Sequence, residues 1–396
     1  MSTVQIASSD LDPFSDEFLA EPYEPHRHLR DAGPVVWLEK YGLWAMARYA
    51  EVRAALSDAE TYCSSAGVGI SDFRREKPWR VPSLLLEADP PEHTRARAVI
   101  SKALSPATVR GLRDNFRATA DKLVDEVVAA GELDAIADFA TRFALTAFAD
   151  AVGLPAAERE NLHSYGNMVF NTFGPRNHLF EEAVAGAGPV REWIDAHCQP
   201  DLLAPDGLGM RIHRIAAEHG LSTSDSALLL RSFLSAGVDT TVHSLGNAIF
   251  CFAENPAEWD ALRAEPALAR TALDEVIRYE SPVQTFFRTT TREVDAGGVR
   301  VPAGAKVLLF LGSANRDPRH WDAPDRFSVR RRVAGHVGFG FGIHACVGAV
   351  MARLEGEIVL ASMAERIGRI EPAGKPRRLL NNTLRGRTHL PVRVVV

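Results

Sequence analysis

The chain has 396 residues, of which 46% are hydrophobic and 24% are charged. Its 45 basic and 51 acidic side chains give a formal net charge of −6, which leaves no basic excess for a general nucleic-acid binder. The 29 glycines and 23 prolines are close to average usage and exclude fibrous repeats. The start has no signal-peptide pattern, and no apolar run approaches the ~18 residues of a membrane-spanning helix. We therefore expect a soluble, cytoplasmic protein that binds neither nucleic acid nor membranes.

Helical patterns cover most of the chain. A proline follows a capping residue at Asp89-Pro90 and again at Ser105-Pro106, as is typical of helix starts. The longest pattern is apolar on nearly every side, which predicts a helix buried through the centre of the molecule. Expected helices run over 105–127, about 224–253 and about 268–279, and one follows Cys346 with Val350, Leu354, Ile358 and Met363 facing inward.

Strand signals are fewer and weaker. Short alternating or β-branched runs predict strands over 299–301, 306–311 and 390–396. Regular strand–helix alternation and a GxGxxG turn are both missing, which argues against a doubly wound sheet. No linker or internal repeat divides the chain. We expect a mainly α protein with small β-sheet regions, folded as a single domain over residues 1–396.

A glycine-rich loop precedes the last predicted helix. Five glycines fall within residues 335–348, and they bring Cys346 to the first turn of that helix. Free N–H groups and the helix dipole there should lower the thiol pKa, as a metal ligand or a nucleophile requires. A nucleophile paired with His344 is disfavoured, because two residues along an extended loop do not readily form a nucleophile–base hydrogen bond. A buried structural cysteine is the alternative for Cys346 taken alone.

Polar residues also interrupt the helical patterns. Asp239 and Thr240 lie within the long apolar run, and burial of an acid costs several kcal/mol unless it is partnered. A functional role therefore explains Asp239 better than packing does, whereas Thr240 could simply hydrogen-bond the carbonyl of Ala236. Glu275 and Arg278 are three residues apart on one helix face and can pair, although a solvated surface pair is the commoner case.

The order Phe339-x-x-Gly342-x-His344-x-Cys346-x-Gly348 resembles the haem-binding loop of the cytochrome P450 superfamily. The resemblance extends over about residues 12–396. It implies that the Cys346 thiolate ligates the iron of haem b, which lies between the central helix and the helix after the cysteine loop. Phe339 would then shield the sulfur. The remaining residues implied to contact the haem or its propionates are His93, Arg97, Ala236, Arg288, His344 and Gly348.

The same resemblance implies a monooxygenase that uses O₂, two electrons and two protons. Thr240 would hydrogen-bond the oxygen and Asp239 would relay protons from solvent. A structural core would consist of Glu275, Arg278 and Arg326. Electrons would come from an iron–sulfur ferredoxin and its NAD(P)H-dependent reductase, since the chain has no flavin or NAD motif. Arginines at 326 and 330–332 could dock the acidic ferredoxin, or they could form a solvated basic turn.

One face of the central helix suggests the substrate. Ser232 and Thr240 are eight residues apart, which is ~12 Å along a helix and matches one ring with a polar head. Residues 77–84, 169–175, 231–237 and 281–288 resemble the P450 subfamily that oxidises para-substituted benzoates such as 4-methoxybenzoate. That resemblance implies a carboxylate site at Arg80, Ser83, Arg231 and Ser232, and a pocket that also includes Leu86, Phe170, Phe173, Ser235, Val283 and Phe286.

Three alternatives remain open at this point. The protein could be a P450 monooxygenase that acts on a terpenoid, a fatty acid or an antibiotic precursor. The protein could instead bind haem without turnover, or it could be a helical scaffold that contains no haem. Asp239 and Thr240 favour turnover, because a carrier needs neither residue.

Overall fold

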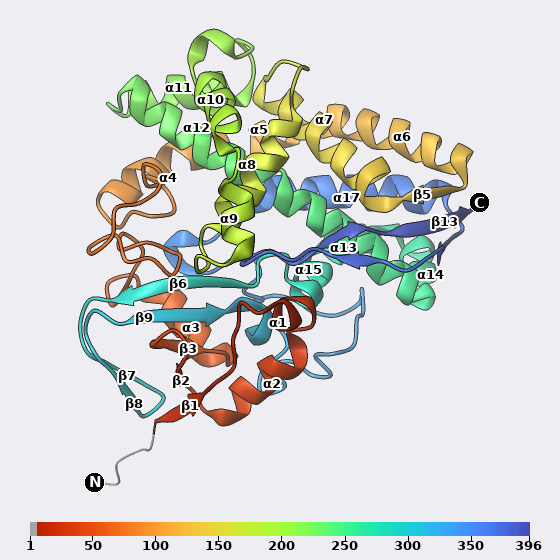
Figure 1. Ribbon diagram of the computed structural model, residues 1–396. Helices are drawn as coiled ribbons and strands as arrows, with labels where there is room; N and C mark the ends of the chain where they lie inside the picture. The colour runs from red at the N-terminus through yellow and green to blue at the C-terminus, as the bar shows by residue number, and fades with distance from the viewer. Residues whose placement is uncertain (1–5) are drawn as a thin grey trace.

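The computed structural model describes residues 6–396. Figure 1 shows a large helical part above a smaller part that is built on a six-stranded sheet. The described residues begin at the edge strand of this sheet, β1, and end at β13 on the opposite side of the molecule. The α-helices are α1 (Asp16–Ala20), α2 (Tyr23–Ala32), α3 (Tyr49–Ser57), α4 (Glu92–Ala103), α5 (Pro106–Arg110), α6 (Arg113–Ala130), α7 (Thr141–Val152), α8 (Glu160–Asn171), α9 (His178–Val184), α10 (Ala187–His197), α11 (Leu208–Glu218), α12 (Thr223–Gly237), α13 (Asp239–Glu254), α14 (Pro256–Ala264), α15 (Ala269–Glu280), α16 (Leu311–Ala314) and α17 (Ala349–Arg366).

The strands form one larger sheet and three small ones. The six-stranded sheet has the order β1-β2-β3-β9-β6-β4, and a three-stranded sheet has the order β10-β13-β5. Two hairpins, β7-β8 and β11-β12, complete the set. The strands are β1 (Ala7–Ser9), β2 (Val36–Leu38), β3 (Leu43–Met46), β4 (Tyr62–Cys63), β5 (Glu132–Asp134), β6 (Thr285–Thr290), β7 (Val294–Ala296), β8 (Val299–Val301), β9 (Lys306–Phe310), β10 (Arg369–Pro372), β11 (Arg377–Arg378), β12 (Arg387–His389) and β13 (Pro391–Val395).

The mainly α class with small sheets is therefore confirmed, and so are the three predicted strands. The larger sheet was not predicted, although both of its faces are buried. On β9, Val307 and Leu309 belong to one apolar cluster, whereas Leu308 and Phe310 belong to another on the opposite face. The neighbouring β6 runs antiparallel to β9, with Arg288 opposite Val307. This alternation turns the side chain of Arg288 to the helical side of the sheet, where the site lies.

The predicted central helix is interrupted once. A capping box between Ser222 and Asp225 starts α12, and α13 begins after Val238, whose φ and ψ of −89° and −61° remain helical. The interruption coincides with Gly237, where an added Cβ would lie 2.1 Å from Cε2 of Phe148. The Thr240 hydroxyl also donates to the Ala236 carbonyl at 2.6 Å. Both features lie at the position where the sequence places the oxygen chemistry.

Other helix boundaries differ from the predictions. The helix over 105–127 is divided between α5 and α6. The helix predicted from Asp89 starts at Glu92 instead, because the Asp89 carboxylate accepts hydrogen bonds from the amides of Ser64 and Ser65 and caps that segment. On α17, Leu354, Ile358 and Met363 are buried as predicted, but Val350 is 45% exposed. The prediction for Val350 is therefore wrong; the neighbouring Met351 takes the buried position.

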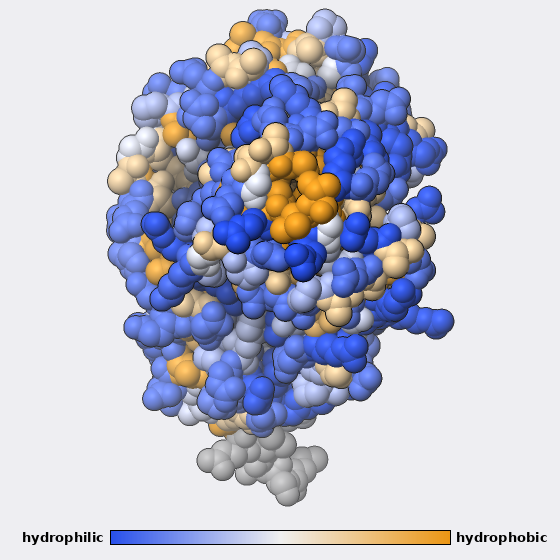
Figure 2. All heavy atoms as spheres, turned by 90° about the vertical axis from the view of Figure 1, so that its right-hand side faces the viewer, coloured by the Kyte–Doolittle hydropathy of each residue, from blue (hydrophilic) through white to orange (hydrophobic). Residues whose placement is uncertain are grey.

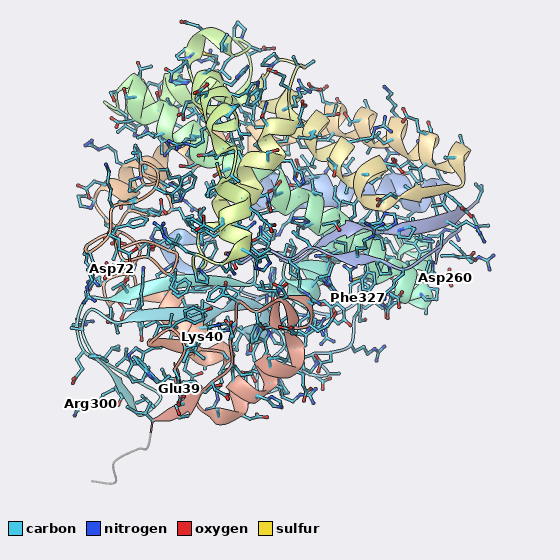
Figure 3. All side chains as sticks on the ribbon, in the orientation of Figure 1. Glu39, Lys40, Asp72, Asp260, Arg300 and Phe327 are labelled. Carbon is cyan, nitrogen blue, oxygen red and sulfur yellow. The ribbon has the colours of Figure 1, made fainter. Side chains whose placement is uncertain are left out.

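Charge and hydropathy separate the outside from the core. Charged side chains such as Glu39, Lys40, Asp260 and Arg300 lie at the periphery, whereas Phe327 is buried in the helical part (Figure 3). Figure 2 shows a mostly hydrophilic surface with one compact hydrophobic group near the centre of that face. Within residues 6–396, no helix is both long and apolar enough to cross a membrane.

Candidate active site

One cavity lies between α8, α12, α13, α17, strand β6 and the glycine-rich loop before α17. The elements that line it are far apart in sequence, from Leu56 on α3 to Gly356 on α17. Most of the residues singled out from the sequence lie on its wall. These are Arg80, Ser83, Leu86, Arg97, Phe170, Phe173, Arg231, Ser232, Ser235, Ala236, Thr240, Val283, Phe286, Arg288, Phe339, His344, Cys346 and Gly348.

Cys346 projects into the cavity from the end of the glycine-rich loop. Its amide donates to the Phe339 carbonyl at 2.7 Å, and Gly340, between them, has a φ of +67° that favours glycine. The amides of Gly348 and Ala349 point at the sulfur, as the sequence predicts, but α17 itself starts only at Ala349. Cys346 is exposed to the cavity, but the loss of solvent around the sulfur still raises the thiol pKa in spite of both amides. The predicted lowering is therefore not found for the thiol alone; a bound haem iron would favour the thiolate form of Cys346.

Four nitrogen-bearing side chains lie close to the cysteine loop. The imidazole rings of His93 and His344 are 4.2 Å apart between centroids, and neither Nε2 atom has a hydrogen-bond partner within residues 6–396. Arg97 donates to the Ala345 carbonyl at 2.5 Å, and the buried Arg288 donates only to its neighbour Phe287 at 2.8 Å among the described residues. His93 lies behind His344 and does not line the cavity.

This cluster has donors and positive charge, and within residues 6–396 none of its four members is ion-paired with an acid; the nearby Asp89 carboxylate accepts from the amides of Ser64 and Ser65. Burial, reinforced by the nearby Arg288 and His93, lowers the pKa of His344 to about 3. Burial likewise lowers the pKa of Arg288 to about 10. Buried cations of this kind are stable only when a counter-ion joins them. The two carboxylates of haem b would supply that charge, so the residues present fit this group, and Cys346 would be the residue that holds its iron.

The predicted acid–alcohol pair points in two directions. Thr240 lines the cavity, but the buried Asp239 carboxylate turns away from it and contacts His163 Nδ1 on α8 at 2.5 Å. The other oxygen of Asp239 has no partner among the described residues. The glycine at 166 leaves room for the Asp239 carboxylate, because an added Cβ there would lie 2.5 Å from Asp239 Oδ2. The hydrogen bond to Asp239 raises the pKa of His163, whose side chain is 42% exposed.

A second buried acid, which the sequence analysis missed, lines the cavity. Glu355 on α17 accepts a hydrogen bond from the Thr241 hydroxyl at 3.2 Å, while its other oxygen has no partner within residues 6–396. Burial raises the Glu355 pKa to about 8. The available signal was a lone acid among the apolar positions of α17. The two buried acids therefore have different partners: Asp239 contacts His163, and Glu355 contacts Thr241.

The far end of the cavity is polar. The hydroxyls of Ser83 and Ser232 are 2.8 Å apart, and Arg231 donates to the Val81 carbonyl at 2.6 Å. The guanidinium of Arg80, however, pairs with Glu87 through two hydrogen bonds of 2.9 and 3.2 Å. The structure thus brings together all four residues predicted to hold a carboxylate. It adds Glu87, which the sequence analysis missed because it lies in an irregular segment without periodicity.

Aromatic rings line the space between this polar end and Cys346. The Phe170 and Phe173 centroids are 5.8 Å apart, and Phe173 and Phe286 are separated by 5.9 Å. Tyr165 also lines the cavity, one helical turn before Val169 on α8, and was missed. Its i, i+4 spacing to Val169 was the signal that could have found it. The middle of the cavity is therefore lined by aromatic and apolar side chains.

The predicted structural core contains a different arginine. Glu275 and Arg278 form a buried two-point pair with bonds of 2.7 and 2.9 Å. The second arginine at Glu275 is Arg331, at 3.2 Å, whereas Arg326 is exposed and takes part only through its carbonyl. The prediction for Arg326 is thus wrong: its side chain points outward, and Arg331, five residues later in the same loop, contacts Glu275 instead. A largely apolar cavity that contains a cysteine and buried cationic side chains is the kind of site expected in a haem-thiolate protein.

Comparisons with known proteins give the family. A family model described as Cytochrome P450 matches residues 208–381. Cytochrome p450 CYP199A2 of Rhodopseudomonas palustris is 53% identical, over 97% of this chain and 93% of the relative. Erythromycin C-12 hydroxylase of Saccharopolyspora erythraea is 32% identical over 92% of each chain. The solved structure of cytochrome P450 CREJ in complex with (4-ethylphenyl) dihydrogen phosphate matches with a TM-score of 0.87 and 26% identity, covering 97% of this chain and 99% of that one.

The chain belongs to the cytochrome P450 family. It is a monooxygenase whose haem b is ligated by a cysteine thiolate, so the family and the enzyme class expected from the sequence are confirmed. The motif in the loop makes Cys346 the residue that we propose as this ligand. The other residue roles stay proposals, which rest on the geometry described above.

Proposed function

We propose that this enzyme oxidises para-substituted benzoates, for example by O-demethylation of 4-methoxybenzoate. The observation that carries the proposal is the Ser83 and Ser232 hydroxyl pair beside Arg231 at the polar end of the cavity. From Ser232 to Thr240 the chain rises ~12 Å along the helix. A benzoate whose carboxylate binds at the polar end therefore presents its para substituent near Thr240 and Cys346.

The hydroxyl pair is suited to a carboxylate. The Ser83 oxygen accepts a hydrogen bond from the amide of Leu86 at 3.0 Å, and the Ser232 hydroxyl donates one to the Leu228 carbonyl at 2.9 Å. Both hydroxyls can rotate their hydrogens to an anion bound between them. A neutral ester gives these donors weaker acceptors and leaves Arg231 without a counter-charge. Selection of the acid over its ester is therefore the expected property of this end of the cavity.

The rest of the cavity orients the ring. Phe170, Phe173 and Phe286 flank it, and Val283 and Leu86 complete the apolar wall. When bound, haem b supplies the activation of O₂ by two electrons. One oxygen atom then enters the methoxy carbon and the other leaves as water, after which the product separates into 4-hydroxybenzoate and formaldehyde. The protons needed for water are held at Thr240 and Asp239, and His163 connects Asp239 to solvent.

We also propose that residues 1–396 act as one haem domain that receives electrons from an iron–sulfur ferredoxin and its NAD(P)H-dependent reductase in the cytoplasm. Candidate docking residues are Arg326 and Arg332, which are exposed near the cysteine side. Arg330 pairs with Glu265 at 2.5 Å, and Arg331 is held at Glu275. Turnover should fall between about 50 and 300 mM salt, the screening range for an electrostatic contact. An unchanged rate would contradict this docking.

A spectral titration tests the substrate. We expect 4-methoxybenzoate to displace the water ligand of the iron and give a high-spin absorbance change, whereas methyl 4-methoxybenzoate should give none at the same concentration. A response to both, or to terpenoids and fatty acids alone, would reject a carboxylate-selective site. In the reconstituted system, NADH consumption with 4-hydroxybenzoate formation separates turnover from mere haem binding.

A further inference from the structure

The Arg80–Glu87 pair changes the charge at the polar end of the cavity. Glu87 is 2% exposed and Arg80 is 9% exposed at their side chains. Glu87 accepts two hydrogen bonds from Arg80 and a third, at 2.7 Å, from the amide of Ser83. It therefore fixes both the arginine and the segment that carries the Ser83 hydroxyl. The Arg80–Glu87 ion pair is therefore a fixed part of the wall at this end of the cavity.

This pair leaves one free positive charge for a ligand. The charge of Arg80 is balanced by Glu87, so Arg231 is the charged side chain on this part of the wall without an acidic partner among the described residues. Arg191 also lies nearby, on the ring of Trp79, but it is exposed and screened by solvent. A carboxylate carries one negative charge and matches Arg231. An aryl phosphate carries close to two negative charges above pH 7 and exceeds it.

We propose that Glu87 is a specificity-determining residue that, by neutralising Arg80, restricts the anion site to ligands of a single negative charge. Glu87 acts through Arg80 and Ser83, so it is a positioning residue and not a catalytic one. The proposal rests on the benzoate function proposed above and adds the charge class of the substrate. It separates this enzyme from a P450 of the same fold whose solved complex holds an aryl phosphate.

The test compares two ligands of equal ring size, 4-methoxybenzoate and 4-methoxyphenyl phosphate, at about pH 8, where the phosphate is a dianion. The high-spin titration is run on the haem-loaded wild type and on Glu87→Gln. We expect the wild type to prefer the benzoate by about 100-fold or more, and Glu87→Gln to reduce that preference by about tenfold or more, because Arg80 then faces the ligand uncompensated. The quantity compared is the ratio of the affinities for the benzoate and the phosphate. If the variant loosens the segment around Ser83, both affinities fall together and the ratio does not change.

Two further variants complete the design. Glu76→Gln removes one negative charge from an exposed residue bound to Ser71, and it should leave the ratio unchanged. Glu87→Asp keeps the charge, so this variant should still prefer the benzoate over the phosphate even if it binds the benzoate more weakly than the wild type does. If Glu87→Gln does not load haem, a loss of benzoate preference in Glu87→Asp overturns the proposal. Equal ratios in wild type and Glu87→Gln would also overturn it while leaving the benzoate function intact. A wild type that binds haem but no benzoate would reject the function itself.

Discussion

The Asp239 carboxylate contacts the imidazole of His163 and not the cavity. The hydrogen bond between them raises the pKa of His163, while burial raises the pKa of Asp239. The contribution of His163 to stability is full below the unfolded pKa of about 6.5 and is lost as the pH rises through the folded value. Asp239→Asn should therefore lower the His163 pKa, which NMR titration of the ring measures directly. Asp16→Asn, at an exposed acid, is the control and should leave His163 unchanged.

Thr240 provides the second prediction at the residue scale. Thr240→Ala removes the hydroxyl that lines the cavity, so we expect NADH oxidation to continue while product yield per NADH falls roughly tenfold and peroxide rises. The matched control is Thr119→Ala on α6, whose hydroxyl bonds the carbonyl four residues earlier in the same way as Thr240 does. Equal product yields in both variants would remove Thr240 from oxygen handling.

How far individual residues could be predicted depended on their spacing. Cys346 and the Glu275–Arg278 pair follow from short, fixed intervals along the chain. Arg326 failed because the loop that carries it has no regular period, so nothing in the sequence distinguishes its orientation from that of Arg331. Glu87 and His163 were missed for a related reason. Each meets a partner, Arg80 or Asp239, across an irregular segment or from another helix.

At the scale of elements, the junction of α12 and α13 is the most sensitive place. Gly237→Ala would place a Cβ 2.1 Å from the ring of Phe148, so the free energy of unfolding should fall by ~1–3 kcal/mol. Gly188→Ala on α10 is a matched control, because an added Cβ there meets no atom within 4 Å. That variant should be unchanged or stabilised by up to ~1 kcal/mol. Urea unfolding of both proteins measures the difference; equal stability would mean that the close contact with Phe148 is not required.

Elements were predictable where a periodic pattern was long. The helices over 224–253 and 268–279 have many turns of consistent patterning, and both appear. Strands β1 to β4 have only two to four residues each, too few for a period of two to emerge. Strand β6 was missed because its Phe286, Phe287 and Arg288 run does not alternate, since both faces of the sheet are covered.

At the scale of the whole molecule, Glu280 connects α15 to the C-terminal strands. Burial opposes its ionisation, but Arg385, Arg387 and Arg378 lie 3.5 to 3.8 Å away and lower the Glu280 pKa to about 2. Because the folded pKa lies below the ordinary 4.5, this acid stabilises the fold above about pH 4.5, and that stabilisation is lost as the pH falls toward 2.

Glu280→Gln removes the charge and leaves the arginines unbalanced. We expect a loss of ~3–5 kcal/mol at pH 7, because one partner of a buried ionic network has been deleted. The difference from the wild type should shrink as the pH is lowered from about 5 toward 2, since the carboxylate of the unfolded chain is protonated near its ordinary pKa of 4.5 and that of the folded protein only near 2. Denaturant unfolding at several pH values measures it, and a difference that did not depend on pH would contradict the ionic role.

Helix α8 serves two regions of the enzyme at once. One side carries Tyr165, Val169 and Phe170 to the ring pocket, and another carries His163 to Asp239. If α8 moves as a rigid body away from a bulky substrate, the distance between the His163 imidazole and the Asp239 carboxylate must also increase. A compound too large for the pocket would thus fit poorly and would also slow the delivery of protons. Substrate selectivity and the yield of product per NADH should therefore fall together.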